Sequence, residues 1–235
     1  MDHSIFRRLI SPFQEFGLLC GSLYTLDRLL SRLSPHLRVL VYELMVQPIS
    51  PTPILPPRLA RKLAVRVLER GDPDLSAVIA PESTQRTRFA QDAICLATYS
   101  DGRLIGYVWL SFDRYEEDEA RCTFVVNPAG KAAFDFDLVV LPEYRMGLGF
   151  AGLWHSTNDY LRSRGITCTF SRLTRFNLAS RRAHARLGSR RVGQAVIFKF
   201  WSVEIIASTI APYIYISANP RSRAPMKLYP TPLPE

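Results

Sequence analysis

Two glycines stand where a predicted strand gives way to a predicted helix. The strand ends near Leu141, Gly147 and Gly149 follow two residues apart, and the helix begins at once. The first turn of a helix leaves backbone N–H groups unpaired and carries a partial positive charge, and glycine lets an anion approach that backbone closely. The junction is therefore a candidate cradle for a pyrophosphate. A tight turn that binds nothing would use the same glycines, so this pattern alone leaves both interpretations open.

A second pattern lies one predicted helix and one predicted strand further along, in the segment 177–188, NLASRRAHARLG. Asn177 stands at the start of a predicted helix and Gly188 at its end, which are the residue types that cap helices. The helix carries His184, whose side chain changes charge near neutral pH and can act as an acid or a base.

Taken in this order, the two patterns resemble the GNAT superfamily of acyl-CoA-dependent N-acyltransferases. The segment LPEYRMGLG is similar to the family's acyl-CoA loop, Q/R-x-x-G-x-G/A. The spacing Asn177-x-x-Ser180-x-x-x-His184-x-x-x-Gly188 is similar to the family's N-x-x-A/S-x-x-x-Y-x-x-x-G-F. The loop is one residue shorter than usual, so Tyr144 aligns with its first position. His184 stands where many members have tyrosine, and the resemblance covers roughly residues 59–200.

The resemblance implies an α/β fold with a mixed sheet, namely a central twisted, mostly antiparallel sheet flanked by helices. Acetyl-CoA, or another acyl-CoA, would lie between two splayed strands, with its pyrophosphate on the 147–149 loop and its thioester along the strand 134–141. Asn177 would approach the acyl carrier arm as well as cap its helix. The resemblance requires no metal. The residues that it assigns to acyl-CoA are Leu141, Tyr144, Arg145, Met146, Gly147, Leu148, Gly149, Phe150, Asn177 and Ser180.

Direct transfer to an amine needs a group that takes a proton, and it benefits from an acid near the departing thiolate. By the resemblance, His184 is the leading candidate for that acid. A hydrogen-bonded core histidine or a helix-surface histidine without a catalytic role is the alternative interpretation.

The candidate bases are carboxylates. Asp135 and Asp137 alternate with Phe134 and Phe136, so we expect both to point to one face of a strand. Burial of two such acids is costly without partners, and a raised pKa would suit a general base. Pairing with the arginines of residues 162–191 is the alternative. Glu117 and Glu119 in the acidic run 113–119 are further candidates, and that run could instead attract a cationic amine or form a solvated loop.

The composition is that of a globular protein able to bury a core without disulfides. The chain has 235 residues, of which 47% are hydrophobic and 22% charged, and its formal net charge of +9 favours anionic partners. Four cysteines without a CxxC pair and four histidines do not predict a zinc site, and the cysteines suggest small buried side chains in a reducing compartment. No stretch of 18 apolar residues occurs, so we expect a soluble cytoplasmic protein.

The periodicity divides the chain into three parts. Residues 1–36 are expected to form two amphipathic helices packed on the core, broken near Gly21 or the Ser11–Pro12 step; residues 37–217 form the GNAT-like domain; residues 218–235 form a proline-rich extended tail. Strands are predicted over 37–45, 93–100, 103–112, 121–127, 133–141, 166–171, 191–202 and 213–217. Helices are predicted over 59–70, 84–92, from the glycine loop to about 164, and over 177–187.

Other functions remain open at this stage. Nine arginines and no acid lie within residues 162–191, which could serve an acyl-CoA phosphate or a nucleic acid, although no nucleic-acid-binding motif is present. The same fold could transfer long acyl chains or aminoacyl groups, or act as a non-catalytic module that binds acyl-CoA or nucleic acid. The apolar N-terminal helices could also contact a membrane surface. The sequence identifies neither the amine acceptor nor the oligomeric state.

Overall fold

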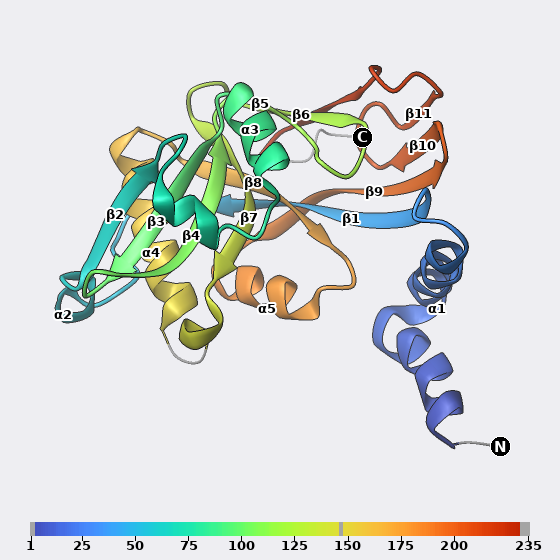
Figure 1. The fold of residues 1–235 in the computed structure, drawn as a ribbon, viewed down its shortest axis with the longest axis horizontal. Coiled ribbons are helices and arrows are strands. Elements are labelled where there is room, and N and C mark those ends of the chain that lie inside the picture. Colours follow the sequence, from blue (N-terminus) through green and yellow to red (C-terminus); the bar gives the residue numbers. More distant parts are fainter. Residues whose placement is uncertain (1–2, 146–147, 231–235) are drawn as a thin grey trace.

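A long mixed sheet organises the part of the chain that the computed structural model describes, residues 3–145 and 148–230. Nine strands follow the order β11-β10-β9-β1-β8-β7-β4-β3-β2 (Figure 1). Neighbours pair antiparallel except β7 and β8, which are parallel. The predicted fold class is therefore confirmed. The strands are β1 (Leu37–Pro48), β2 (Leu63–Leu68), β3 (Ile94–Ser100), β4 (Arg103–Ser111), β7 (Ala132–Val140), β8 (Cys168–Thr174), β9 (Arg190–Phe200), β10 (Val203–Ser208) and β11 (Ile214–Ser217).

A second, three-stranded sheet contains β5 (Arg114–Glu116), β6 (Cys122–Val126) and β12 (Ala224–Leu228). The strand β12 comes from the proline-rich tail and pairs parallel with β6. Aromatic rings join the two sheets, because Tyr115 and Phe124 stack on Phe134 of β7, with ring centroids 5.4 and 4.8 Å apart. The small sheet thus fixes the acidic loop between β5 and β6 against the central strands.

The helices cover the large sheet on both faces. The helix α4 (Gly149–Ser163) contacts β2, β3, β4 and β7, burying Leu153, Trp154 and Leu161. Its neighbour α5 (Leu178–Arg186) lies close to it through His184, while α3 (Glu82–Ala90) packs Phe89 on Trp109 of β4. The remaining short helices are α2 (Pro57–Ala60) and the 3-10 turns η1 (Pro73–Ala77) and η2 (Pro142–Tyr144).

The N-terminal helix α1 (His3–Leu33) is two helices joined at a sharp kink. Gly17 makes the kink with φ 79°, a left-handed conformation that glycine adopts without a steric cost. The segments cross so tightly that a Cβ on Gly21 would lie 2.9 Å from the Cα of Phe13. Two helices were predicted, but the break is not at Gly21 or Ser11–Pro12, because Gly21 is needed at the crossing rather than at the turn.

The helix predicted over residues 59–70 is wrong. The chain there makes only the short α2 and then β2, an edge strand paired antiparallel with β3. Val65 and Val67 alternate with Arg66 along it, and β-branched residues favour a strand once a neighbouring edge is available. The sequence also gave no prediction for β10, which continues from β9 through the two-residue turn at Trp201.

Candidate active site

A fork between two central strands forms the base of the candidate site. The strands β7 and β8 pair only through Ala132–Phe134 and Cys168–Phe170 among the described residues. Beyond that segment β7 pairs with β4 and β8 pairs with β1, so that the edges which face each other carry backbone groups available to a ligand. A parallel pair that opens in this way creates a slot in the middle of the sheet.

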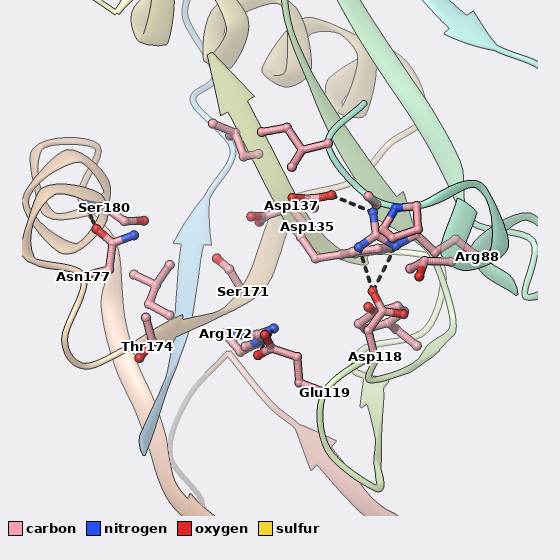
Figure 2. Close-up of a pocket in the computed structure, with 18 residues that line it drawn as sticks. Arg88, Asp118, Glu119, Asp135, Asp137, Ser171, Arg172, Thr174, Asn177 and Ser180 are labelled. Carbon is pink, nitrogen blue, oxygen red and sulfur yellow. Dashed lines mark hydrogen bonds and ion pairs between the residues drawn. The ribbon is translucent and has the colours of Figure 1, made fainter. Parts of the chain in front are cut away.

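A pocket of about 470 Å³ lies at this fork (Figure 2). Its walls come from the loop before α3, from α3 itself, from the acidic loop, from the diverging strands and from the start of α5. The polar residues that line it are Thr84, Arg88, Tyr115, Asp118, Glu119, Asp135, Asp137, Ser171, Arg172, Thr174, Asn177 and Ser180. Five of the residues predicted for the site therefore line one pocket, namely Glu119, Asp135, Asp137, Asn177 and Ser180.

Asp135 is the first residue of β7 beyond the paired segment, and it is only 2% exposed. Burial raises the pKa of Asp135 to about 7, with the neighbouring hydroxyl groups of Thr169 and Ser171 opposing the shift. Within the described residues, Oδ1 of Asp135 and both of those hydroxyl oxygens have no hydrogen-bond partner. The carboxyl group therefore stands in the pocket with no cation beside it, so a proton acceptor of nearly neutral pKa is available there.

Asp137 has a different environment, because it sits in a β-bulge and is paired. Two residues of β7, Asp137 and Leu138, face the single residue Val108 of β4, and Asp137 adopts a left-handed φ of 48°. Its Oδ2 accepts a hydrogen bond of 2.7 Å from Nη1 of Arg88. The alternation expected for this strand is thus interrupted, although Asp135 and Asp137 both line the pocket. The cation comes from α3 and not from residues 162–191.

Arg88 is the buried centre of this side of the pocket. Its Nη2 and Nε also donate to Oδ2 of Asp118 at 2.7 and 3.0 Å (Figure 2). Its guanidinium lies 5.2 Å from the ring centroids of both Trp109 and Phe136. Sequence reasoning missed Arg88, since its neighbours on α3 are polar and show no pattern. Arg88 forms short charged contacts with two of the pocket acids, Asp118 and Asp137.

Glu119 belongs to a second charged group on the opposite wall. Nη2 of Arg172 contacts Oε2 of Glu119 at 2.9 Å and Oε1 of the buried Glu117 at 2.5 Å. The hydroxyl of Tyr42 donates to both carboxylates at 3.3 Å. Burial raises the pKa of Glu117, and the charge of Arg172 opposes that shift. Arg172 was also missed, although a charged residue inside the apolar strand FSRLT was a usable signal.

His184 lies outside the lining of the pocket. It is 3% exposed, its Nδ1 is 3.1 Å from Oε1 of Gln47, and its ring meets the rings of Phe150 and Trp154 edge-on. With the Gln47 amide in this orientation, the tautomer protonated on Nδ1 forms the hydrogen bond, because an amide oxygen only accepts. Burial lowers the pKa of His184 to about 4, so the imidazole is neutral at neutral pH. The structure thus separates His184 from the carboxylates, and its predicted role as an acid remains a prediction.

Asn177 and Ser180 combine a structural role with a place in the pocket. Oδ1 of Asn177 accepts a 3.0 Å hydrogen bond from the backbone N–H of Ser180, which caps α5 as predicted. Both residues also line the pocket. Capping therefore does not prevent either residue from facing a ligand.

The glycine loop leads from η2 to the first turn of α4. The helix begins at Gly149, and the first N–H groups of a helix have no acceptor within the helix itself. A Cβ on Gly149 would collide with the carbonyl oxygen of Tyr144, so glycine is required here by the loop itself. Leu141 anchors the loop by donating its N–H to Ile105, and Nε of Arg145 donates to the Val140 carbonyl. Met146 and Gly147 lie outside the described residues.

The family follows from comparison with known proteins. The model of the acetyltransferase (GNAT) family matches residues 65–189, which is more than half of the chain and contains the fork, the glycine loop and α5. This chain belongs to the GNAT acetyltransferase family. The recognition made from the two sequence patterns is confirmed. No functionally curated protein matches the sequence.

The chain also has distant likenesses to solved structures of GNAT proteins. A GNAT-family protein from Novosphingobium aromaticivorans is 19% identical, with a TM-score of 0.45 over 66% of this chain. A GCN5-related N-acetyltransferase from Kribbella flavida is 15% identical, with a TM-score of 0.40 over 70% of this chain. This chain spans 61% and 60% of the lengths of those two proteins.

The site of this GNAT protein fits the acyl-CoA that the family uses in general. The fork offers unpaired strand edges, and the first turn of α4 offers N–H groups that an anionic phosphate can accept from. Within the described residues, no group of three or more His, Cys, Asp and Glu side chains is placed to hold a metal ion. No described helix is long and apolar enough to span a membrane.

Proposed function

We propose that this protein transfers an acyl group, with acetyl as the first candidate, from acyl-CoA to a primary amine in a direct ternary complex. The observation that carries the proposal is Asp135, a buried carboxyl group at the fork whose pKa burial raises to about 7, and whose Oδ1 has no hydrogen-bond partner among the described residues. A carboxylate that structural ion pairs do not occupy is suited to take the proton of an amine.

The donor side of the proposal uses the fork and the glycine loop. The edge of β7 beyond Phe134 would hold the thioester, and the first turn of α4 would hold the pyrophosphate. The residues proposed to contact acyl-CoA remain Leu141, Tyr144, Arg145, Met146, Gly147, Leu148, Gly149, Phe150, Asn177 and Ser180. The length of the acyl chain is part of the test below.

The acceptor side is acidic, which supports an amine as the substrate. Four carboxylates, Asp118, Glu119, Asp135 and Asp137, line the pocket with two arginines, Arg88 and Arg172. Two positive and four negative charges leave a formal charge of −2 when all are ionised, and the excess draws a cationic ammonium into the pocket.

The proposed reaction removes a proton from the substrate ammonium and supplies a proton to the departing thiolate. Asp135 takes a proton from the substrate ammonium, and the freed lone pair of the nitrogen attacks the thioester carbonyl carbon. The carbon–sulfur bond breaks, the nitrogen gives up its second proton as the amide forms, and the departing thiolate takes up one proton, so that the proton held by Asp135 is released to solvent in net. His184 remains the proposed source of the thiolate's proton, which it would donate as an imidazolium that gains its extra proton from the reacting nitrogen, whereas Asp137 and Glu119, which are paired with arginines, would mainly orient the acceptor. No cysteine lines the pocket among its described residues, so the proposal needs no acyl-enzyme.

Calorimetric titration with acetyl-CoA, a long-chain acyl-CoA and free CoA tests the donor, followed by thiol release with a panel of amines. The proposal expects saturable one-to-one binding and amine-dependent release of CoA. Binding without release with any amine would indicate a non-catalytic module, and no binding of any CoA species would contradict the proposal.

A further inference from the structure

The second segment of α1 turns an apolar stripe towards the solvent. Five of its leucines are exposed, from 39% for Leu26 to 80% for Leu18. At about 100° per residue, these leucines fall within one arc of about 100° around the helix. The leucines are Leu18, Leu19, Leu26, Leu29 and Leu33. We call this set the leucine arc.

The opposite side of the same helix packs against the rest of the protein. Asp27 accepts a hydrogen bond from the backbone N–H of Val39 and pairs with Nε of Arg38 at 2.9 Å, which fixes the helix to β1. Tyr24 of this segment packs on Phe176 with ring centroids 5.0 Å apart, and Phe16, just before the kink, packs on the same ring at 5.2 Å. These contacts set the orientation of the helix. The leucine arc faces the solvent because the opposite side of the helix packs against the rest of the protein.

An exposed tryptophan stands beside the end of this helix. Trp201 is 69% exposed and occupies the two-residue turn between β9 and β10, with a left-handed φ of 51°. Such turns favour asparagine or glycine, and a bulky residue there is unfavourable. The N–H of Trp201 donates to the carbonyl of His36, three residues after Leu33, and α1, β9 and β10 lie at the same end of the molecule (Figure 1).

The charges around the leucine arc favour an anionic partner. Arg28 and Arg32 are exposed along one edge of the arc, and Asp27 is the single acid between Leu18 and His36. Since Asp27 is already bound to Arg38, residues 18–36 offer no second carboxylate to the arginines of another copy. The preceding acid along the chain, Glu15, lies beyond the kink. Leucine, tryptophan and arginine on one surface are the set that an interfacial helix presents to anionic lipid.

We propose that the leucine arc, together with Trp201, Arg28 and Arg32, docks this protein on an anionic phospholipid bilayer, with the helix lying in the plane of the surface. The apolar side chains enter the interface while the two arginines meet phosphate groups. The inference does not depend on the proposed transfer reaction, because none of these residues lines the pocket.

Vesicle flotation tests the docking. We expect the protein to float with vesicles of phosphatidylcholine mixed with phosphatidylglycerol, and to float several-fold less with phosphatidylcholine alone or at high salt. Trp109 and Trp154 are at most 1% exposed, so a blue shift of tryptophan emission on adding anionic vesicles reports Trp201. The variant W201F should lose that shift. An absence of flotation with the anionic vesicles would overturn the proposal.

Matched variants separate docking through the leucine arc from nonspecific adsorption of exposed apolar residues to lipid. The triple variant L26S, L29S and L33S should lose flotation at least tenfold, whereas I214S with I216S, which changes equally exposed apolar residues on β11, should retain it. Circular dichroism and acetyl-CoA titration should match the wild type in both variants. Equal loss in both, or a dimer by light scattering that only the leucine variant dissociates, would contradict the proposal, the latter result assigning the arc to a second copy.

Discussion

Asp135 and Ser171 are the first residues beyond the point where β7 and β8 stop pairing, one on each arm of the fork. Both are at most 3% exposed, and Oδ1 of the one and Oγ of the other have no hydrogen-bond partner among the described residues. Buried polar atoms are normally paired, so two unpaired oxygens at the mouth of a strand fork mark a place where a substrate can supply the missing contacts.

Removing Arg88 should destabilise the fold because it leaves Asp118 and Asp137 without their cation. Arg88→Met keeps most of the side-chain volume, and we expect the free energy of unfolding in urea to fall by about 3 kcal/mol. Arg86→Met is the matched control on the same helix, since its pair with Glu82 is exposed, and it should cost about 0.5 kcal/mol or less. Similar small losses in both variants would mean that Arg88 is not holding these acids.

The glycine loop can be tested with two glycines of one helix. Gly149→Ala places a Cβ against the Tyr144 carbonyl, so the loop must move and acetyl-CoA affinity should fall at least tenfold by calorimetry. Gly152→Ala meets only ordinary contacts, the closest at 3.4 Å to Ile105, and should bind as the wild type does. Unchanged affinity in a folded Gly149→Ala variant would remove the α4 terminus from the donor site.

The raised pKa of Asp135 predicts how stability depends on pH. Its pKa is 3.8 in the unfolded chain and about 7 in the folded protein, so the protonated form favours folding and this stability is lost as pH rises from about 4 through 7. Asp135→Asn mimics the protonated form. The variant should be more stable than the wild type above pH 7, by up to about 4 kcal/mol, and the difference should vanish below about pH 4. Thermal unfolding across this range measures it, and a constant difference would contradict it.

His184 has the opposite dependence. Its pKa falls from 6.5 to about 4 on folding, so its contribution to stability is present above pH 6.5 and is lost as pH falls towards 4. We expect its ring proton, assigned by NMR with a His184→Gln variant, to show no titration between about pH 5 and 8. A midpoint near or above 6.5 would mean that the imidazole is less buried than described and would restore it as a charged acid.

The local patterns predicted the elements that carry the motifs closely. The helix predicted over residues 177–187 is α5 (Leu178–Arg186), because Asn177 and Gly188 supply both caps, and the strand predicted over 133–141 is β7 (Ala132–Val140). Both aspartates of that strand, together with Glu119, line one pocket. The helix and the strand could be predicted because they depend on interactions between residues close in sequence.

The partners of the acids could not be predicted in the same way. Arg88 and Asp137 are 49 positions apart, and their contact depends on a bulge and on how α3 packs against β4. His184 was assigned by its place in the motif, yet the closing of α5 on α4 buries it away from the carboxylates. The strand β2 was missed because an edge strand forms only when its neighbour is present.

The measurement that tests the central claim most directly is the pH dependence of kcat/KM for the wild type and Asp135→Asn, with acetyl-CoA and the best amine found. The account predicts that the wild-type rate rises with pH through a midpoint at about 7, where the Asp135 carboxyl ionises. The variant should lose this limb and about 100-fold in rate while binding acetyl-CoA normally. A variant with the wild-type rate and profile would contradict the assignment of Asp135 as the base.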